Sequence, residues 1–409
     1  MNTPSSPATR RLLNQSAICI VGDGAIAKTT ALGFAQAGQS VTLLCPPAAA
    51  KKADAVEPSW DVRVYALNHT AHGLLSSLKV WGALDAARVA PVDSMVVKGD
   101  GDAPGGLGFD SYGARVGTLA WILEGNNLNQ ALDAALKFAQ NVTVVQGRAA
   151  RLETNTEVAI VHLDNGDAIV SELVVGADGS QSWVRGQCDI GFSYRGYGQR
   201  GVVTNFACEK PHHNAAHQWF TGAEGIVALL PLPGRRVSLV WSAPDELADT
   251  LRRESAAQLA GRLAAYCAEP LGKLTPLEPE LVADFPLALM RPNSIVAPRV
   301  ALVGDAAHAV HPLSGHGMNL GFGDVAQLIE TVNAREAQRG VGDERVLARY
   351  ARARKEDVLL MQFTTDSLVR LFRTDFEPLR VARNVGMSLL DKLPGLKRRM
   401  ISHALGRHN

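Results

Sequence analysis

The feature that most constrains the fold is a strand–turn–helix–strand unit near the start of the chain. Ala17–Gly22 is a short run rich in apolar and β-branched residues that ends in glycine, a pattern typical of a buried parallel strand. Ala25–Gly38 carries apolar residues at helical spacing and closes on a glycine, which predicts a packed helix. Val41–Leu44 predicts a second buried strand. Together these segments predict a βαβ unit and hence an α/β fold.

The turn inside this unit has the spacing of a dinucleotide-binding motif. Gly22 permits a tight turn, Gly24 lets a diphosphate approach the backbone, and Ala27 lets the helix pack closely on the strand. The helix would aim its unpaired N–H groups and partial positive charge at that diphosphate. The acidic residue that usually ends the second strand and binds the adenosine ribose is replaced by Cys45. Either another group holds the ribose, or binding is weaker than usual.

Two later segments place a carboxylate directly after a predicted strand. Asp178 lies in Val174–Ser180, and Asp305 follows the apolar run Val300–Val303. Because open α/β sheets bind ligands at the carboxyl ends of their strands, Asp305 is expected to accept hydrogen bonds from ribose or ribityl hydroxyls. A helix that begins near Met318 would aim its N–H groups at a flat ring and stabilise negative charge on it. Three glycines would let the backbone lie against that ring: Gly315, Gly317 and Gly321.

Composition narrows the classes of function. The 409 residues carry 41 basic and 40 acidic side chains, a formal charge of +1, and 46% of them are hydrophobic. This balance excludes a strongly basic nucleic-acid binder and an acidic disordered protein. The five cysteines show no CxxC spacing, which argues against a zinc site or a disulfide framework. No apolar run approaches the roughly 18 residues that a membrane-spanning helix needs. We therefore expect a cytoplasmic protein.

The three motifs, in this order and spacing, resemble those of the group A FAD-dependent monooxygenases with the p-hydroxybenzoate hydroxylase fold. Gly304–Gly321 is most similar to the branch that hydroxylates intermediates of ubiquinone biosynthesis. Arg63 within Asp61–Leu67, Pro286-Leu287 and the tail around Asp366–Phe372 are similar to that branch too. The resemblance spans roughly residues 17–405.

The resemblance implies an FAD site. Gly22 and Gly24 would lie at the diphosphate, in the same turn as Ala27, and Arg63 near the diphosphate or the ribityl chain. Asp305 would bind the ribityl or ribose hydroxyls.

The other implied positions surround the flavin ring. Pro312 would lie at the isoalloxazine edge, and Gly317, Met318 and Asn319 would offer backbone groups to the pyrimidine ring. Asp178, Gly179 and Arg185 match the motif that supports FAD and the transient reductant site. The departures from the family pattern are Lys28, Cys45 and His316.

The implied architecture is an α/β fold: a Rossmann-like FAD-binding domain, an inserted antiparallel-sheet substrate domain and a C-terminal helical region. Strand-like runs alternate with turns from Asn141 to Thr275, and the chain is predicted as helix from Asp343 onward, with breaks at Pro378 and Pro394. The expected division is a flexible N-terminus (1–15), an FAD-binding domain (16–90, 141–186 and 290–335), a substrate domain (91–140 and 187–289) and a helical region (336–409).

The implied function is FAD-dependent hydroxylation of the ring of a polyprenylated phenol in ubiquinone biosynthesis, with O2, through a C4a-hydroperoxide of the flavin. The reductant would be transiently bound NAD(P)H or a partner electron donor, because no separate NAD(P)H-binding fold is visible. The catalytic side chains are unknown, since no convincing triad is present. Two alternatives stay open: a hydroxylase of a small soluble aromatic compound, and a flavin-poor scaffold paralogue in a biosynthetic complex, which Cys45 keeps in consideration.

Two groups of histidines invite other interpretations. His308 and His311 lie three residues apart, but no third ligand at suitable spacing appears, so no metal site is expected. His212, His213 and His217 lie in the expected substrate sheet. One of them could deprotonate a phenol, whereas a solvated loop is the simpler interpretation.

The C-terminal stretch Leu379–Asn409 holds seven basic residues and one acidic residue, a formal charge of +6, with apolar residues at helical spacing. A basic amphipathic helix can lie on an anionic membrane surface, and such contact would suit a polyprenylated substrate. A helix packed on the flavin domain with a solvated basic face is the equal alternative. Peripheral contact with the inner face of the membrane therefore stays an open option.

Overall fold

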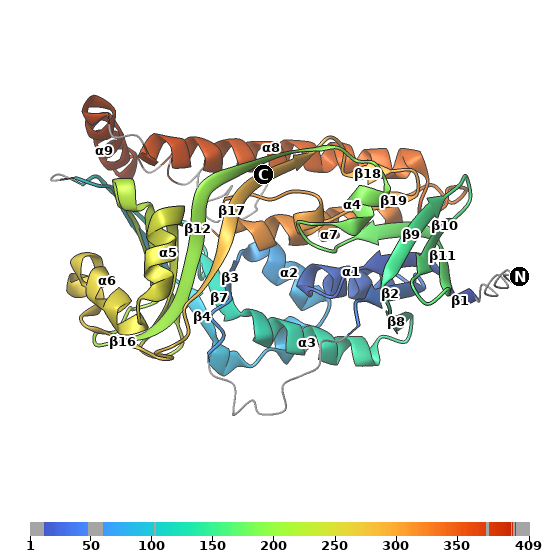
Figure 1. Ribbon diagram of the computed structural model, residues 1–409, viewed down its shortest axis with the longest axis horizontal. Coiled ribbons are helices and arrows are strands. Elements are labelled where there is room, and N and C mark those ends of the chain that lie inside the picture. Colours follow the sequence, from blue (N-terminus) through green and yellow to red (C-terminus); the bar gives the residue numbers. More distant parts are fainter. Residues whose placement is uncertain are drawn as a thin grey trace, which may run out of the picture.

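The structure is a computed structural model that describes residues 12–47, 60–101, 104–311, 313, 315–373, 376–393, 395 and 397. Two large sheets lie side by side, joined by the long strands β12 (Phe192–Cys208) and β17 (Ala283–Pro292) (Figure 1). Helix α8 (Glu344–Arg373) runs along one edge of both parts. Among the described residues, no helix combines the length and apolarity needed to cross a bilayer.

The first sheet is built around the predicted βαβ unit. Its order is β18-β19-β11-β1-β2-β8, with β10 and β9 continuing antiparallel from β11. The pairs β8/β2, β2/β1, β1/β11 and β11/β19 are parallel. The bounds are β1 (Leu12–Val21), β2 (Val41–Cys45), β8 (Val142–Gln146), β9 (Ala149–Thr154), β10 (Ala159–Leu163), β11 (Ala168–Gly176), β18 (Val296–Ala297) and β19 (Val300–Leu302).

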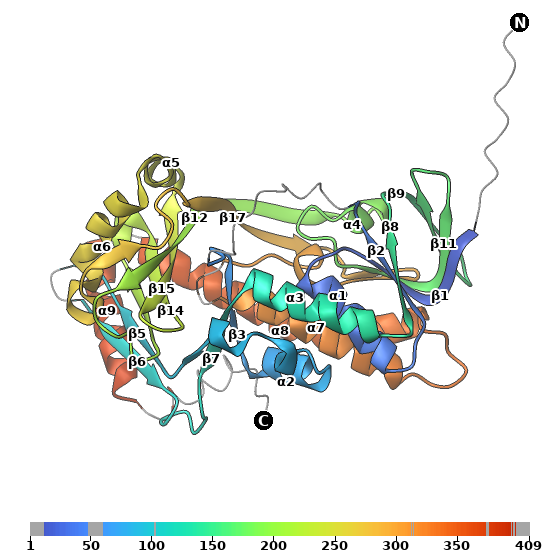
Figure 2. The ribbon, with the colours of Figure 1, turned by 90° about the horizontal axis from the view of Figure 1, so that it is seen from below.

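Helices cover this sheet because its central strands are apolar on both faces. Figure 2 shows α3 beside α1, with α7 and α8 behind them. The bounds are α1 (Ala25–Gln36), α3 (Gly125–Phe138), α4 (Trp183–Gln187) and α7 (His316–Asn333). Near the flavin motifs a small sheet, β3-β7-β4, carries helix α2; the bounds are β3 (Val64–Leu67), α2 (His69–Ser77), β4 (Val89–Val92) and β7 (Ala120–Glu124).

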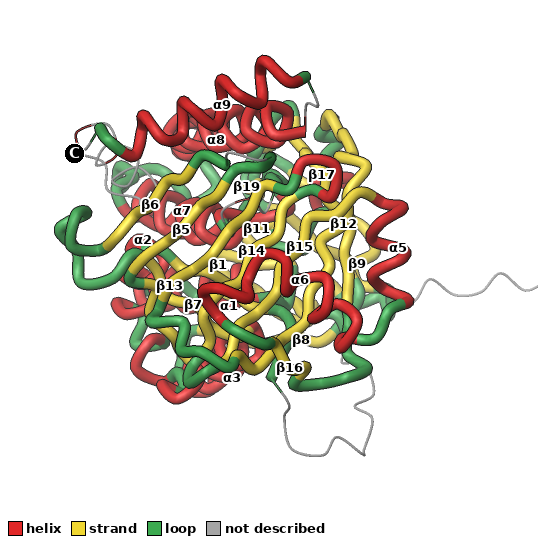
Figure 3. The backbone as a smooth tube through the Cα atoms, turned by 90° about the vertical axis from the view of Figure 1, so that its left-hand side faces the viewer, coloured by secondary structure: helices red, strands yellow, loops and turns green. Residues whose placement is uncertain are grey.

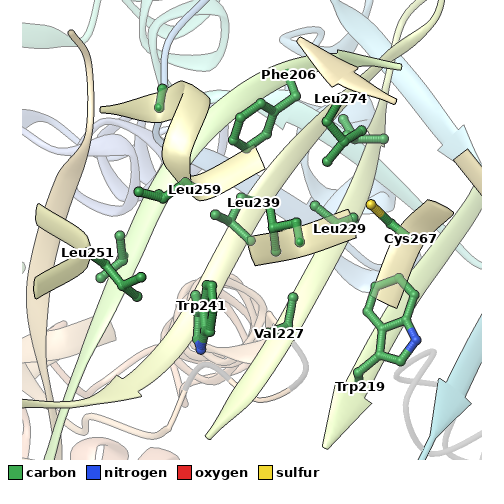
Figure 4. Packing of buried hydrophobic residues seen from close by; sticks show 14 of the residues in the cluster. Phe206, Trp219, Val227, Leu229, Leu239, Trp241, Leu251, Leu259, Cys267 and Leu274 are labelled. Carbon is green, nitrogen blue, oxygen red and sulfur yellow. The ribbon is translucent and has the colours of Figure 1, made fainter. Parts of the chain in front are cut away.

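The second sheet has the order β16-β12-β15-β14-β13-β5-β6. Helices α5 and α6 pack on one face around Phe206, Trp219 and Trp241 (Figure 4). It is antiparallel as predicted, except for the parallel pair β13/β5. The bounds are β5 (Ser94–Lys98), β6 (Gly106–Asp110), β13 (Ala215–Phe220), β14 (Ile226–Leu232), β15 (Arg236–Pro244), α5 (Asp245–Arg253), α6 (Ala256–Leu271) and β16 (Leu274–Pro276).

Helix α9 (Glu377–Asp391) follows α8, and both lie on the same edge of the molecule (Figure 3). Pro378 stands in the first turn of α9, where a backbone N–H has no partner within the helix, so a proline there loses no hydrogen bond. A helix therefore begins at the predicted break. The predicted break at Pro394 lies outside the described residues.

Two expected boundaries are wrong. The flexible N-terminus was expected to extend to residue 15, but β1 begins at Leu12. Leu12 and Asn14 pair with β11, and the Asn14 side chain donates to Thr42 Oγ1 at 2.7 Å. The expected substrate segment 91–140 divides: β5 and β6 join the second sheet, whereas β7 and α3 belong with β3 and α1. Hydrophobic pattern alone does not show which sheet a short strand will join.

Candidate functional site

The three motifs converge at one end of the first sheet. Gly22 has φ +139°, and a Cβ there would overlap the carbonyl oxygen of Ala177, so the first motif needs this glycine to pass the second. The Ile26 side chain, in the first turn of α1, lies against Gly304 and Gly321 of the third motif. The loops at Gly22, Ala177 and Gly304 are therefore packed directly on one another.

Arg185 joins the second and third motifs. It is buried, and its guanidinium donates to the Ala306 carbonyl at 2.9 Å and to the Ser180 carbonyl at 2.8 Å. The guanidinium also lies over the ring of Phe192, with 4.6 Å between its central carbon and the ring centroid. The structure thus places Arg185 between loops, where it fixes their spacing.

Two helix N-termini in this region lack side-chain caps. The N-cap residue of α1 is Gly24 and that of α7 is Gly315, which has φ +66°; neither helix has a side-chain cap or an acidic residue in its first turn. A Cβ built at Gly24 or Gly317 would meet nothing within 4 Å. Since the first N–H groups of a helix have no partner within it, both ends offer donors and positive potential to an anionic or carbonyl-bearing ligand.

Asp305 is exposed to solvent in the turn Gly304–Ala306, which leads toward α7. Desolvation by the surrounding protein raises the pKa of its carboxyl, an effect that the nearby His308 opposes. Arg63 lies beside Tyr65: burial raises the pKa of the Tyr65 hydroxyl, Arg63 lowers it by its charge and a hydrogen bond, and the charges of Asp61 and Asp305 raise it.

Asp178 binds the first turn of helix α4, whose N-cap residue is Ser182. Its Oδ2 accepts from the Val184 N–H at 3.0 Å, while Oδ1 is buried with no partner among the described residues. A buried acceptor without a donor costs about 1–3 kcal/mol. Oδ1 is therefore a natural acceptor for a ligand hydroxyl or amide.

A buried charge cluster that the sequence analysis missed lies beneath the third motif. Asp324 Oδ2 accepts from the Gly304 N–H at 2.9 Å and pairs with His308 Nε2 at 2.7 Å, while Oδ1 accepts from Arg354 Nε at 2.7 Å. Burial alone would raise the pKa of Asp324, but His308 and Arg354 more than offset it, so the pKa is lowered. The cluster holds the Gly304–Asp305 turn in place. Asp324 occupies a helix position in sequence, so only its burial distinguishes it.

Asn319 is committed to the frame of the site. Its Oδ1 accepts from the Asn68 N–H at 2.9 Å, and its Nδ2 donates to the Ala66 carbonyl at 2.7 Å. These bonds tie β3 and the start of α2 to the first turn of α7. The backbone groups of Gly317, Met318 and Asn319 remain at the helix end, whereas Pro312 lies outside the described residues.

The two unusual residues near the first motif have clear neighbours. Lys28 Nζ pairs with Asp133 Oδ1 at 2.6 Å and so joins α1 to α3. The Cys45 thiol lies 3.7 Å from the Gly22 carbonyl, to which it donates. Burial, followed by the charge of Asp23, raises the pKa of Cys45 to about 11, so the thiol stays protonated. Cys45 is a weak partner for a ribose.

The structure does not bring the histidines of the second sheet to this site. His217 stacks on Trp219, which faces α6, and His212 accepts from the Asn214 N–H within its own loop. The solvated-loop interpretation is wrong for both, since both are buried; it holds for His213, which is exposed in a turn.

His311 instead lies between the two parts of the molecule. It is fully buried, its Nε2 is 3.3 Å from Gln199 Oε1, and its ring meets Tyr197 edge-on with centroids 4.9 Å apart. Its Nδ1 has no hydrogen-bond partner among the described residues. Burial, only partly opposed by Asp366, lowers the pKa of His311 to about 4, so it is neutral near pH 7.

This burial predicts a pH-dependent stability. An unfolded histidine has a pKa of about 6.5 and binds a proton that buried His311 refuses down to about pH 4. Its contribution to the free energy of unfolding is therefore full above pH 6.5 and falls as pH drops toward 4, by up to about 1.4 kcal/mol per pH unit. We expect urea unfolding between pH 7 and pH 5 to show a smaller loss of stability in His311→Asn than in the wild type; equal losses would contradict the assignment.

Comparison with known proteins places the chain in a family. A family model described as FAD binding domain matches residues 126–361, more than half of the chain. The ubiquinone hydroxylase UbiL of Rhodospirillum rubrum is 34% identical over 412 residues, 98% of this chain and 92% of that protein. The chain belongs to the ubiquinone-biosynthesis hydroxylase family of FAD-dependent monooxygenases.

Other relatives of this flavoprotein agree. The 3-demethoxyubiquinol 3-hydroxylase of Escherichia coli is 34% identical over 391 residues, 95% of this chain and 98% of that protein. Among solved structures, P. aeruginosa PqsL in complex with 2-aminobenzoylacetate has a TM-score of 0.74 at 22% identity, over 90% of this chain and 99% of PqsL. Klebsiella pneumoniae HpxO complexed with FAD and uric acid has a TM-score of 0.71 at 16% identity, over 94% of this chain and 97% of HpxO. The predicted α/β flavoprotein fold is confirmed.

Proposed function

We propose that this enzyme hydroxylates the aromatic ring of a polyprenylated phenol in ubiquinone biosynthesis, with FAD as cofactor and O2 as the oxygen source. The observation that carries the proposal is the nearly full-length alignment, at 34% identity, with a ubiquinone hydroxylase and a demethoxyubiquinol hydroxylase. Bound FAD, once reduced, supplies the reaction with O2 and the transfer of one oxygen atom to the ring. The chain itself has to bind the cofactor and the substrate, orient them and exclude water.

The residues around the three loops fit FAD. The open approach at Gly24 and the uncapped N-terminus of α1 suit a diphosphate, and the solvent-accessible carboxylate of Asp305 suits ribityl hydroxyls. The uncapped N-terminus of α7 would donate to the carbonyl and nitrogen edge of the ring and stabilise negative charge there. The remaining proposed cofactor contacts are Gly22, Ala27, Arg63, Asp178, Pro312, Gly317, Met318 and Asn319.

An apolar wall beside α7 suits a prenylated ring. Ala66 accepts from Asn319 through its carbonyl, and its side chain packs in the same apolar cluster as Val64, Met95 and Leu230, all only half-buried. Half-buried apolar side chains bury further when an apolar ligand packs on them. This wall favours the polyprenylated phenol over a small soluble aromatic acid, whose carboxylate would need a cationic partner.

The reductant and the working environment belong to the same proposal. NAD(P)H would bind transiently or a partner would deliver electrons, because the described residues contain one dinucleotide-type βαβ unit. A polyprenylated substrate partitions into bilayers, so we place the enzyme at a membrane surface, alone or within a biosynthetic complex.

The proposal predicts a specific product. Purified protein with FAD, NADPH, a prenylphenol and isotopically labelled O2 should give a ring-hydroxylated product that carries one labelled oxygen atom, measured by mass spectrometry. Turnover of soluble hydroxybenzoates with none of the prenylphenol would favour the small-substrate alternative. A colourless protein that cannot be reconstituted with FAD would favour the scaffold.

A further inference from the structure

Exposed apolar side chains gather at one end of the chain. Of the 17 large hydrophobic side chains that are exposed among the described residues, eight fall between residues 360 and 393. They are Leu360, Phe363, Phe376, Leu379, Val381, Val385, Leu389 and Leu393. A concentration of this kind on a soluble surface marks an interaction site.

Helix α9 buries two polar side chains together with Met387 on the face that meets the protein. Arg383 donates to both Asp100 oxygens at 2.6 and 2.5 Å, and Asn384 donates to the Asp100 carbonyl at 2.8 Å. The hairpin beneath is rich in glycine, and a Cβ at Gly99 or Gly105 would overlap Asn384. The polar contact is therefore close, and its hydrogen bonds fix the helix in this orientation.

The opposite face of α9 is apolar and open. Val381, Val385 and Leu389 recur every four residues and are 54%, 53% and 55% exposed. Residues four apart share a helix face, so these three side chains form one stripe. These apolar side chains contribute no burial energy while they are exposed to water, and they would contribute it if an apolar partner covered them.

Helix α8 presents mainly cations and apolar groups on its own solvent face, with one acid among them. The residues that recur at helical spacing along this face are Arg345, Arg349, Arg352, Glu356, Leu360 and Phe363. At its start, a recess of about 360 Å³ is lined by four arginines and one acid: Glu336, Arg339, Arg345, Arg349 and Arg352, with Ala348 between them.

The charges in this recess are incompletely balanced. Glu336 pairs with Arg349 at 2.9 Å and with Arg339 at 3.1 Å. Arg345 and Arg352 make no ion pair among the described residues, which leaves their guanidinium groups to bind an anion such as a phosphate.

We propose that the solvent faces of α8 and α9 form a docking surface for an anionic lipid bilayer. The recess at Arg345 and Arg352 would bind lipid phosphates, while the stripe Val381–Val385–Leu389 would enter the interface between head groups and acyl chains. Both helices lie along the same edge of the molecule (Figures 1 and 3). In the sequence, residues 392–409 carry five basic residues and no acidic one.

A bilayer fits this surface better than a second copy of the chain. A stable protein interface buries roughly 800 Å² on each partner, with matched shape and charge. One stripe of three side chains falls short of that area, and two arginine recesses facing each other would repel. A bilayer needs no shape match and supplies the missing negative charge.

The inference rests on the proposed function only for its purpose, the delivery of a bilayer-dissolved substrate. The experiment is vesicle flotation of the full-length enzyme. We expect it to float with phosphatidylcholine vesicles that contain phosphatidylglycerol, to stay unbound with phosphatidylcholine alone, and to detach in high salt. Val381→Ser/Val385→Ser/Leu389→Ser and Arg345→Gln/Arg352→Gln should each lower binding about tenfold or more.

Matched controls lie on α3, on the far side of the molecule from α8 and α9 (Figure 1). Lys137→Gln/Phe138→Ser removes one exposed cation and one apolar side chain that is 85% exposed, and should bind vesicles like the wild type. All altered side chains face solvent, so thermal unfolding should be unchanged in every variant.

Activity separates failure of this inference from failure of the proposed function. The surface variants should hydroxylate a short-chain, water-soluble prenylphenol at the wild-type rate and lose turnover of a long-chain one in vesicles. No vesicle binding by the wild type, or equal binding by all variants, would overturn the inference. So would a wild-type dimer that the stripe variant dissociates, which would assign the surface to a second copy. Vesicle binding without hydroxylation would instead reject the proposed function alone.

Discussion

Gly24→Asp is expected to abolish FAD retention while leaving the cofactor-free chain slightly more stable. Gly24 is the N-cap of α1, has φ −77°, and has open space where a side chain would stand. Aspartate is among the preferred N-cap residues and its charge favours a helix N-terminus, so the apo chain should gain about 0.5–1 kcal/mol. The same carboxylate would occupy the approach proposed for the diphosphate.

The size of the effect follows from Coulomb's law. Two like charges about 4 Å apart at an effective dielectric of about 20 repel by about 4 kcal/mol, which corresponds to roughly a thousandfold loss of affinity. Fluorescence titration of the apoprotein with FAD measures the affinity, and thermal unfolding without FAD measures the stability. Gly24→Asp protein that purifies yellow, with wild-type FAD affinity, would remove Gly24 from the diphosphate site.

Gly22→Ala is the informative contrast. Gly22 has φ +139° and touches the Ala177 carbonyl, so alanine there strains the chain with or without FAD. We expect lower apo stability in Gly22→Ala and not in Gly24→Asp. One glycine is required by the fold, and the other by the ligand.

Asp324→Ala is expected to lower the free energy of unfolding by about 3–5 kcal/mol, the usual result of removing one partner of a buried charge cluster. Asp324 is fully buried and pairs with both His308 and Arg354. Its loss leaves the Arg354 charge without its buried partner and frees the Gly304 N–H, so FAD affinity should fall as well. Urea unfolding of the apoprotein reports the first effect, and FAD titration the second.

Two further variants test this account. Asp357→Ala removes a partner of Arg354 that is 34% exposed, and should cost less than about 1 kcal/mol. Asp324→Leu/Arg354→Met removes both buried charges and should be more stable than Asp324→Ala. If the double variant is the less stable of the two, the cost lies in packing and not in the unpaired charge.

The pH dependence of this cluster has a definite sign. The pKa of Asp324 is lowered in the folded chain. Its stabilising contribution is therefore present above the unfolded carboxyl pKa of about 3.9 and is lost as pH falls through the lower, folded value. Above pH 5, the titration of the Asp324 carboxyl itself should therefore add nothing to the pH dependence of the stability.

Local sequence was a sound guide wherever neighbouring residues decide the structure. The strand, turn and helix from Ala17 to Leu44 formed as predicted, because the turn needs Gly22 and the helix carries its own apolar face. The helix after the third motif begins at His316, two residues before the expected Met318, and Pro378 opens α9. Periodicity and turn chemistry act over a few residues, so they are visible in a single segment.

Sequence alone determined the flavoprotein family and the order of its three motifs, since each motif is a contiguous string whose glycines and carboxylates have local roles. Only the tertiary structure decided that Asp324 balances His308, that His311 rather than His217 lies between the two sheets, and that α9 turns its valines outward. These facts depend on contacts between residues that lie far apart in the sequence. Burial and charge pairing arise from such contacts and not from any single segment.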